Sequence, residues 1–216
     1  MIHYFENFAS DFLKKDIETE ILKSPYWLWQ YRADTASTYD TPEYACLEDE
    51  NTEDSPQLVH LINSDKDMAI VNPLIYEIYK IVDAKVQFQR IKANLLWPNA
   101  VKNPNAYHRP HADHGREDAK SLIYYVNDSD GDTVIFKNCW SGEDPGPLEI
   151  ERRITPKAGS AVLFDSYRYH ASTSPTKNIR SVINFIFWPA VDQQPRELAP
   201  PPVPGDVPIS KGFHKL

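Results

Sequence analysis

The sequence has little glycine and almost no cysteine. Only 7 of its 216 residues are glycine, and no GxGxxG or P-loop pattern occurs, so the folds that cradle nucleotide phosphates find no support. The two cysteines, Cys46 and Cys139, stand far apart and match no metal-binding spacing. We expect both to be reduced thiols, as in a cytosolic protein.

Excess positive charge and long apolar runs are also missing. The formal net charge is −8, so the chain has no overall basic footprint and we expect no nucleic-acid partner. No run approaches the roughly 20 apolar residues that a membrane span needs. The first residues also lack the basic and apolar regions of a signal peptide. We therefore expect a cytoplasmic protein that does not bind membranes.

The residues that are present favour a folded, strand-rich protein. Hydrophobic residues make up 41% of the chain, enough for a core, and the 18 prolines indicate stiff connections. We expect one domain in three parts. Residues 1–85 form a helical support with an acidic loop, residues 86–189 form the β core, and residues 190–216 form a proline-rich tail.

Two segments near the N-terminus have helical periodicity. The first is Asp11–Leu22, with Ser10 as its N-cap. The second is 73–84, where Pro73 suits a first helical position. Between them, residues 31–66 are acidic and broken by prolines, which predicts a long surface loop, either a lid or an unordered segment. The apolar stripes of the two helices are expected to contain Phe12, Leu13, Ile17, Ile21 and Leu22, and Leu74, Ile75, Ile78, Tyr79 and Val82.

The chain then changes to short runs rich in Val, Ile, Phe and Tyr, separated by turn-forming pairs. Eight short antiparallel strands after a helical segment predict a mainly β (α+β) fold. We expect a double-stranded β-helix, a jelly roll of the cupin-like type, with the N-terminal helices supporting one sheet. The expected strands are 86–97, 108–113, 121–126, 133–136, 148–154, 160–164, 167–172 and 180–188.

A histidine-rich segment carries the first candidate site residues. On an extended strand, side chains two positions apart point the same way, so His111 and Asp113 are able to present an imidazole and a carboxylate to one ion. A second histidine from elsewhere would complete the 2-His-1-carboxylate face of non-haem Fe(II) oxygenases. A zinc cluster of His108, His111 and His114 is the alternative, although Pro110 disfavours a helix through it.

Two later residues strengthen the first interpretation. His170 follows a buried-looking strand, and Arg180 opens the last apolar strand ten positions further on. An arginine at the mouth of a barrel is costly without an anionic partner. Its guanidinium can bind a carboxylate with two parallel hydrogen bonds, which a dicarboxylic co-substrate would supply.

The region from about residue 90 to 188 resembles the 2-oxoglutarate/Fe(II)-dependent dioxygenase superfamily, in particular its prolyl 4-hydroxylase-like branch. The resemblance covers just under half of the chain, and the matching segments follow the order and spacing that the family shows. The matching residues are His111, Asp113, Ser121–Asp128, Asp130–Phe136, Pro156–Asp165, His170 and Arg180.

The resemblance implies a role for each matching residue. His111, Asp113 and His170 would bind the iron, and Arg180 would bind the distal carboxylate of 2-oxoglutarate. Tyr125 stands where this branch often has a tyrosine hydroxyl on that carboxylate, while Tyr124 points the other way. The amides of Asn94 and Asn184 lie on expected strands near the site, where each either orients co-substrate or substrate or serves the structure.

The implied activity is hydroxylation of a C–H bond with release of succinate and CO2. The cofactors would be Fe(II), 2-oxoglutarate and O2, with ascorbate as a supporting reductant. The substrate would be a peptide or protein residue, proline-like, or an amino acid. Two other interpretations remain at this point: a non-catalytic jelly-roll binding or structural module, and a metal-dependent cupin-type enzyme that does not use 2-oxoglutarate.

Overall fold

The computed structural model describes the chain except for residues 26, 37–45, 101–102, 104 and 191–216. The proline-rich tail therefore lies outside the described residues, and the expected three-part division stays a prediction. In chain order the elements are β1 (Ile2–Phe5), α1 (Asp11–Leu22), β2 (Gln30–Arg32), β3 (Gln57–Leu61), α2 (Asp65–Val82), β4 (Val86–Leu96), β5 (Lys120–Tyr125), β6 (Thr133–Cys139), β7 (Ile150–Ile154), β8 (Ala161–Asp165), β9 (Arg168–Ser172) and β10 (Arg180–Pro189).

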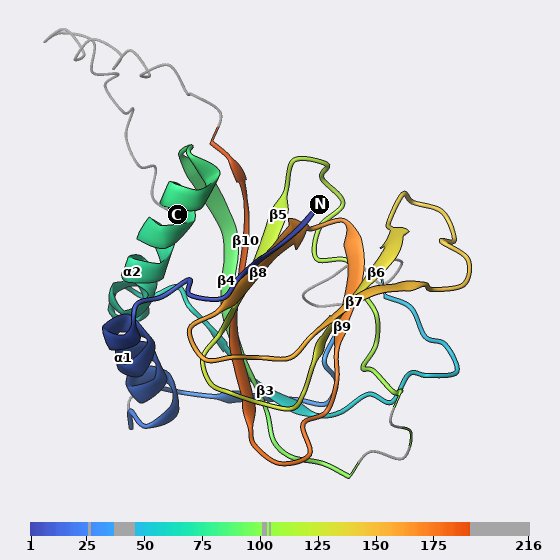
Figure 1. Cartoon of the computed structure of the whole chain (residues 1–216), viewed down its shortest axis with the longest axis horizontal. Helices are drawn as coiled ribbons and strands as arrows, with labels where there is room; N and C mark the ends of the chain where they lie inside the picture. The colour runs from blue at the N-terminus through green and yellow to red at the C-terminus, as the bar shows by residue number, and fades with distance from the viewer. Residues whose placement is uncertain (26, 37–45, 101–102, 104, 191–216) are drawn as a thin grey trace, which may run out of the picture.

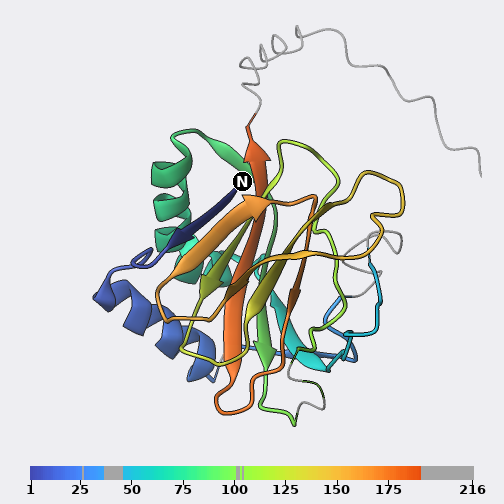
Figure 2. The same ribbon diagram turned by 45° about the vertical axis from the view of Figure 1, so that its right-hand side comes forward.

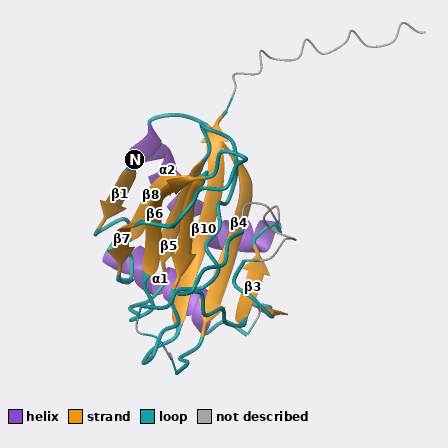
Figure 3. Cartoon of the chain, turned by 90° about the vertical axis from the view of Figure 1, so that its right-hand side faces the viewer, coloured by secondary structure: helices purple, strands orange, loops and turns teal. Residues whose placement is uncertain are grey.

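The strands form two antiparallel sheets that face each other. The larger has the order β1-β8-β5-β10-β4-β3-β2, and the smaller has the order β7-β6-β9. Both helices cover the outer face of the larger sheet, opposite the smaller one (Figure 1), and the view of Figure 3 places the helices behind the strands. The turned view of Figure 2 shows how the two sheets close around an interior. The expected mainly β jelly roll with supporting helices is confirmed.

Helix α1 has the expected bounds. Ser10 caps it by accepting a hydrogen bond from the backbone N–H of Leu13, and Ile17 and Ile21 are buried. Phe12, however, was expected in the apolar stripe and is 82% exposed. The reason is angular: on a helix the stripe that contains Ile17 and Ile21 continues through Leu13 rather than Phe12.

Helix α2 begins earlier than the sequence indicated. Ser64 is the N-cap and accepts a hydrogen bond from the backbone N–H of Asp67, so Pro73 lies inside the helix rather than at its first position. A proline there lacks the N–H that would bond to the Ala69 carbonyl. Burial outweighs this loss, because Val71, Leu74, Ile75 and Ile78 pack into the core beneath the larger sheet.

Seven of the eight expected strands are present with small changes at their ends, and one is absent. Residues 108–113 form no strand, because only His111 pairs there, as an isolated bridge with His170 and with Cys46. Three strands were missed, and each is short: β1, β2 and β3, of which β1 and β2 are the edges of the larger sheet. Short edge strands expose much of their surface and give little hydrophobic alternation to read.

Two of the three buried apolar clusters among the described residues border the larger sheet, and a polar site lies between the sheets. One core lies between the helices and the larger sheet and includes Phe185 and Phe187. The second lies between the two sheets and includes Ile135, Phe164 and Val182. None of the helices among the described residues is long and apolar enough to cross a membrane.

Candidate metal and co-substrate site

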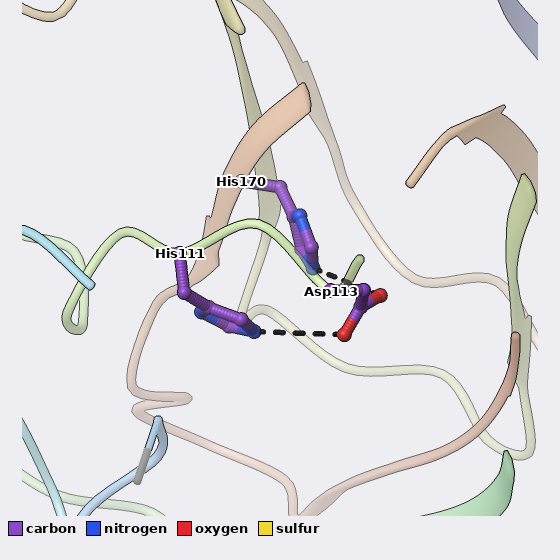
Figure 4. A group of neighbouring side chains, drawn as sticks. All are labelled: His111, Asp113 and His170. Atoms are coloured by element: carbon purple, nitrogen blue, oxygen red, sulfur yellow. Dashed lines mark ion pairs between the residues drawn. The ribbon is translucent and has the colours of Figure 1, made fainter. Parts of the chain in front are cut away.

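Three side chains from the sequence analysis meet between the sheets. His111, Asp113 and His170 each offer one ligand atom, and these atoms all lie within 4.8 Å of one another. The Nε2 atom of His170 is 3.5 Å from Oδ2 of Asp113, and Nε2 of His111 is 4.0 Å from Oδ1 (Figure 4). Two imidazoles and one carboxylate that point at one spot suit a divalent transition metal with open positions.

Backbone hydrogen bonds bring these distant segments together. His170 lies on β9, whereas His111 and Asp113 lie in the connection between β4 and β5. The N–H groups of His111 and His170 each donate to the other residue's carbonyl, at 3.0 and 2.9 Å. Asp113 donates from its N–H to the Ser166 carbonyl. The connection thus forms one local ladder with β9, which aims His111 and Asp113 in the same direction.

The histidine rings are oriented by backbone carbonyls. Nδ1 of His111 lies 3.2 Å from the carbonyl oxygen of Arg109, and Nδ1 of His170 lies 3.1 Å from that of Arg168. Since a carbonyl only accepts, each Nδ1 carries a proton, and Nε2 is the ring nitrogen that faces the shared spot. Burial, reinforced by the nearby His170, lowers the pKa of His111 to about 3, so this ligand is neutral near pH 7.

Asp113 supplies the negative charge of the site. Burial acts to raise the pKa of its carboxyl group, but the nearby His170 and the charge of Arg90 outweigh burial and hold the pKa below its usual value. Three donors fix the carboxylate: Arg90 to Oδ1 at 3.0 Å, Ser121 to Oδ2 at 2.7 Å and Asn184 to Oδ2 at 3.2 Å. The group is therefore ionised and restrained before any metal arrives.

A cavity of about 50 Å³ opens beside the three ligands, and Arg180 lines it. This residue is only 4% exposed, and its guanidinium donates from Nε to the Gly131 carbonyl and from Nη2 to the Thr133 hydroxyl. Burial lowers its pKa, yet an arginine stays charged near neutrality. No carboxylate among the described residues forms an ion pair with it, which leaves a buried cation facing the same cavity as the metal ligands.

Tyr125 and Asn94 both lie near Arg180, but they differ in their hydrogen bonds. The Tyr125 hydroxyl donates to the Thr133 oxygen that also accepts from Arg180, and burial raises the pKa of Tyr125 to about 12. Asn94 lines the cavity, and its buried Oδ1 has no donor among the described residues. Tyr124 packs against Phe8 on the helix side, as expected from the alternation of strand β5.

The alternative cluster of three histidines is not formed. His108 is buried, with Nδ1 2.8 Å from the Ser172 hydroxyl and Nε2 2.9 Å from the Ser174 hydroxyl. The His114 ring contacts the Trp188 ring at 5.4 Å between centroids, and its Nδ1 accepts a hydrogen bond from the backbone N–H of Arg116. The two outer histidines are thus held by other partners, and of these three histidines only His111 belongs to the metal-binding group found among the described residues.

Burial of His108 predicts an acid-sensitive fold. Burial, with the nearby Arg180 charge, lowers the pKa of His108 to about 3, against an ordinary value of 6.5. Because the unfolded chain takes up the proton first, the free energy of unfolding falls as the pH drops from 6.5 towards 3. We expect His108→Gln, which keeps hydrogen-bonding capacity, to reduce this pH dependence by about one proton.

The measurement is denaturant unfolding of the metal-free protein at several pH values between 7 and 4. His3→Gln is the matched control, since His3 lies on edge strand β1 and not beside His108. Equal pH dependence in the His108 variant and the wild type would contradict a buried neutral histidine.

Two polar residues of the site were missed from the sequence, Arg90 and Ser121. A signal for Arg90 was present, because Arg90, Lys92 and Asn94 alternate with the apolar Ile91 and Ala93 along one strand. All three polar side chains line the cavity. Ser121 had no such signal, because a single serine within an apolar strand is common.

The chain was compared with known families and proteins. Residues 96–188 match the model of the 2OG-Fe(II) oxygenase superfamily. This region contains the three candidate metal ligands, together with Arg180. No curated protein sequence matches the chain significantly.

Several solved structures share the fold at low sequence identity. The non-heme alpha ketoglutarate dependent epimerase SnoN from nogalamycin biosynthesis superposes with a TM-score of 0.57 at 8% identity, covering 88% of this chain and 78% of that one. A prolyl hydroxylase from Trichoplax adhaerens, in complex with a hypoxia inducible factor peptide fragment, gives 0.53 at 13% identity, covering 87% and 83%. The family match and the shared fold confirm the resemblance found in the sequence, and residues 96–188 are the part of the chain that matches the 2OG-Fe(II) oxygenase superfamily.

Proposed function

We propose that the chain binds Fe(II) through His111, Asp113 and His170 and uses 2-oxoglutarate and O2 to hydroxylate a C–H bond, with release of succinate and CO2. The observation that carries the proposal is the buried Arg180 guanidinium, which lines the same cavity as the three ligands. A metal site alone would not call for a second buried cation. A dicarboxylic co-substrate explains it, because one carboxylate neutralises Arg180 while the 2-oxo acid end reaches the metal.

The metal ligands and Arg180 have different proposed roles, which follow from their charge and burial. His111 offers a neutral nitrogen donor, His170 offers a second ring nitrogen, and Asp113 offsets one of the two charges of the metal. Arg180 fixes the distal carboxylate, and Thr133, which accepts from both Arg180 and Tyr125, holds the guanidinium in place. The bound iron would supply the oxygen chemistry, namely activation of O2 and oxidative decarboxylation of the co-substrate. The surrounding buried side chains would limit access of water to the reaction.

Tyr125 and Asn94 are proposed to assist the co-substrate. Through Thr133, Tyr125 sets the direction of the Arg180 guanidinium. Asn94 borders the cavity with a polar amide, and an amide side chain can turn to offer its NH2 group to a carboxylate. Both are thus proposed as co-substrate residues, next to Arg180.

For the substrate we propose a peptidyl residue, proline-like, or an amino acid, acted on by a cytoplasmic enzyme. Similarity to a prolyl hydroxylase supports this class, with a peptide fragment bound in that structure. The reacting group of such a substrate would meet the metal in the cavity beside the three ligands.

The test has a binding step and a turnover step. Anaerobic addition of Fe(II) and 2-oxoglutarate should give a weak visible charge-transfer band that a chelator removes and fresh Fe(II) restores. Succinate should then form under air with ascorbate and a panel of proline peptides and free amino acids. A band without succinate would favour the non-catalytic module, and metal binding without a 2-oxoglutarate band would favour the cupin-type enzyme.

Gly131 is expected to be essential for the position of Arg180. A Cβ atom at residue 131 would lie 2.8 Å from the Thr173 carbonyl oxygen and 3.0 Å from Cδ of Arg180. Backbone atoms cannot yield easily, so Gly131→Ala should displace the arginine and weaken 2-oxoglutarate binding by about tenfold, the loss of roughly one hydrogen bond. The measurement is a titration of the charge-transfer band with 2-oxoglutarate.

Gly115→Ala is the matched control for this variant. It is also crowded, since its Cβ atom would clash with the Trp140 ring, but Arg180 is not among the groups that it would meet. Both variants should lower the thermal stability, whereas only Gly131→Ala should change 2-oxoglutarate affinity. Equal affinities in the two variants would show that residue 131 does not position the arginine.

A further inference from the structure

Asp113 is held by side chains from three different strands. Arg90 comes from β4, Ser121 from β5 and Asn184 from β10, and all three donate to its carboxylate. The Asp113 side chain is 0% exposed, so its carboxylate is held by protein groups away from bulk solvent. Ser121 and Asn184 are neutral donors, whereas Arg90 adds a positive charge 3.0 Å from Oδ1.

Arg90 faces this carboxylate together with Lys92 and Asn94, and a β-bulge next to it places Phe88 on the opposite side of the sheet. Between β4 and β10, Ile186 pairs with Arg90 but the next residue, Phe187, pairs with Phe88, so Gln89 is an extra residue. Without the bulge, residues 88 and 90 would point to the same side of the sheet. Instead Phe88 packs against Phe187 on the helix side, and Arg90 faces the cavity between the sheets. Bulges next to functional sites commonly re-aim one side chain in this way.

We propose that Arg90 is a positioning residue for the metal ligand Asp113, and that its charge reduces the electron density that this carboxylate gives to the metal. The inference rests on the proposed function, since it concerns the same metal site. A guanidinium bonded to one carboxylate oxygen draws electron density away from the ligand, as outer partners of metal sites do in general. The metal therefore keeps more of its positive charge and attracts the 2-oxo acid more strongly.

A purely structural role would predict something different. If Arg90 only neutralised a buried carboxylate, its loss would lower stability and metal occupancy without changing the electronic properties of the metal that remains bound. The energy of the charge-transfer band separates the two roles, because that energy depends on the electron density at the metal and not on how many molecules hold one.

The experiment compares Arg90→Gln with Arg90→Lys in the full chain. Glutamine keeps a donor and removes the charge, while lysine keeps the charge. In the anaerobic Fe(II) and 2-oxoglutarate complex, Arg90→Gln should move the band to longer wavelength, and Arg90→Lys should leave it closer to the wild-type position. Affinity for Co(II), measured by absorption, should fall about 10- to 100-fold in Arg90→Gln. Ser121→Ala, which removes a neutral donor, should shift the band in the same direction by less.

The outcomes separate this inference from the proposed function. A wild-type chain without any band overturns the proposed function and this inference with it. A wild-type band whose wavelength is the same in Arg90→Gln overturns the inference alone, even when its intensity falls. If Arg90→Gln does not fold, as judged by thermal unfolding, Arg90→Met is the second neutral variant, and an unshifted band in it has the same meaning.

Discussion

Replacing His170 by alanine should abolish the charge-transfer band and the formation of succinate. His170 is one of three ligands, and its Nε2 atom is aimed by the bond from Nδ1 to the Arg168 carbonyl. Loss of an outer partner of a ligand typically costs 10- to 100-fold in metal affinity, so loss of a ligand should cost more than about 100-fold. The measurement is a Co(II) titration by absorption, followed by the anaerobic band with Fe(II) and 2-oxoglutarate.

His114→Ala is the matched control for this variant. His114 lies only one residue after Asp113, but its ring contacts Trp188 and is no part of the ligand group, so its removal should leave metal affinity and the band unchanged. The fold of both variants is checked by thermal unfolding of the metal-free protein. Should His114→Ala lose the metal while His170→Ala retains it, the ligand set proposed for this chain would be wrong.

Most of the fold could be predicted because the local sequence patterns agree with the strands and helices that form. The strand periodicity after residue 86 gave seven of the expected strands, and Ser10 correctly marked the start of α1. The start of α2 could not be predicted in the same way. A proline is usually read as a helix start, whereas the buried side chains around Pro73 stabilise the helix through it, and this tertiary packing is not visible in the sequence.

Some residues of the site could be predicted from the sequence and others could not, and the difference has a physical reason. His111, Asp113, His170 and Arg180 have residue types that chemistry requires, so they can be found by type and spacing. Arg90 follows the alternation of Lys92 and Asn94, but the sequence does not show the bulge that adds one residue to β4 and places Phe88 on the opposite face. A one-residue change in register reverses the direction of side chains, and no local pattern announces it.

The second large effect is expected for Arg180→Met. Methionine fills most of the buried space but cannot bind a carboxylate, so affinity for 2-oxoglutarate should fall about 100-fold, the loss of two charge-assisted hydrogen bonds. Affinity for the metal should change little, because the guanidinium donates to Gly131 and Thr133 and to none of the three ligands. Both affinities can be read from titrations of the same protein, with Co(II) and with 2-oxoglutarate.

A shorter 2-oxo acid makes the interpretation unambiguous. Pyruvate chelates a metal in the same way but has no distal carboxylate, so the wild type and Arg180→Met should bind it with equally low affinity. The variant thus loses only the discrimination between the two acids. If Arg180→Met weakens pyruvate binding as much as 2-oxoglutarate binding, Arg180 supports the site as a whole and does not bind the distal carboxylate. If neither affinity changes, the cation belongs to the structure, and the cupin-type enzyme without 2-oxoglutarate becomes the better interpretation.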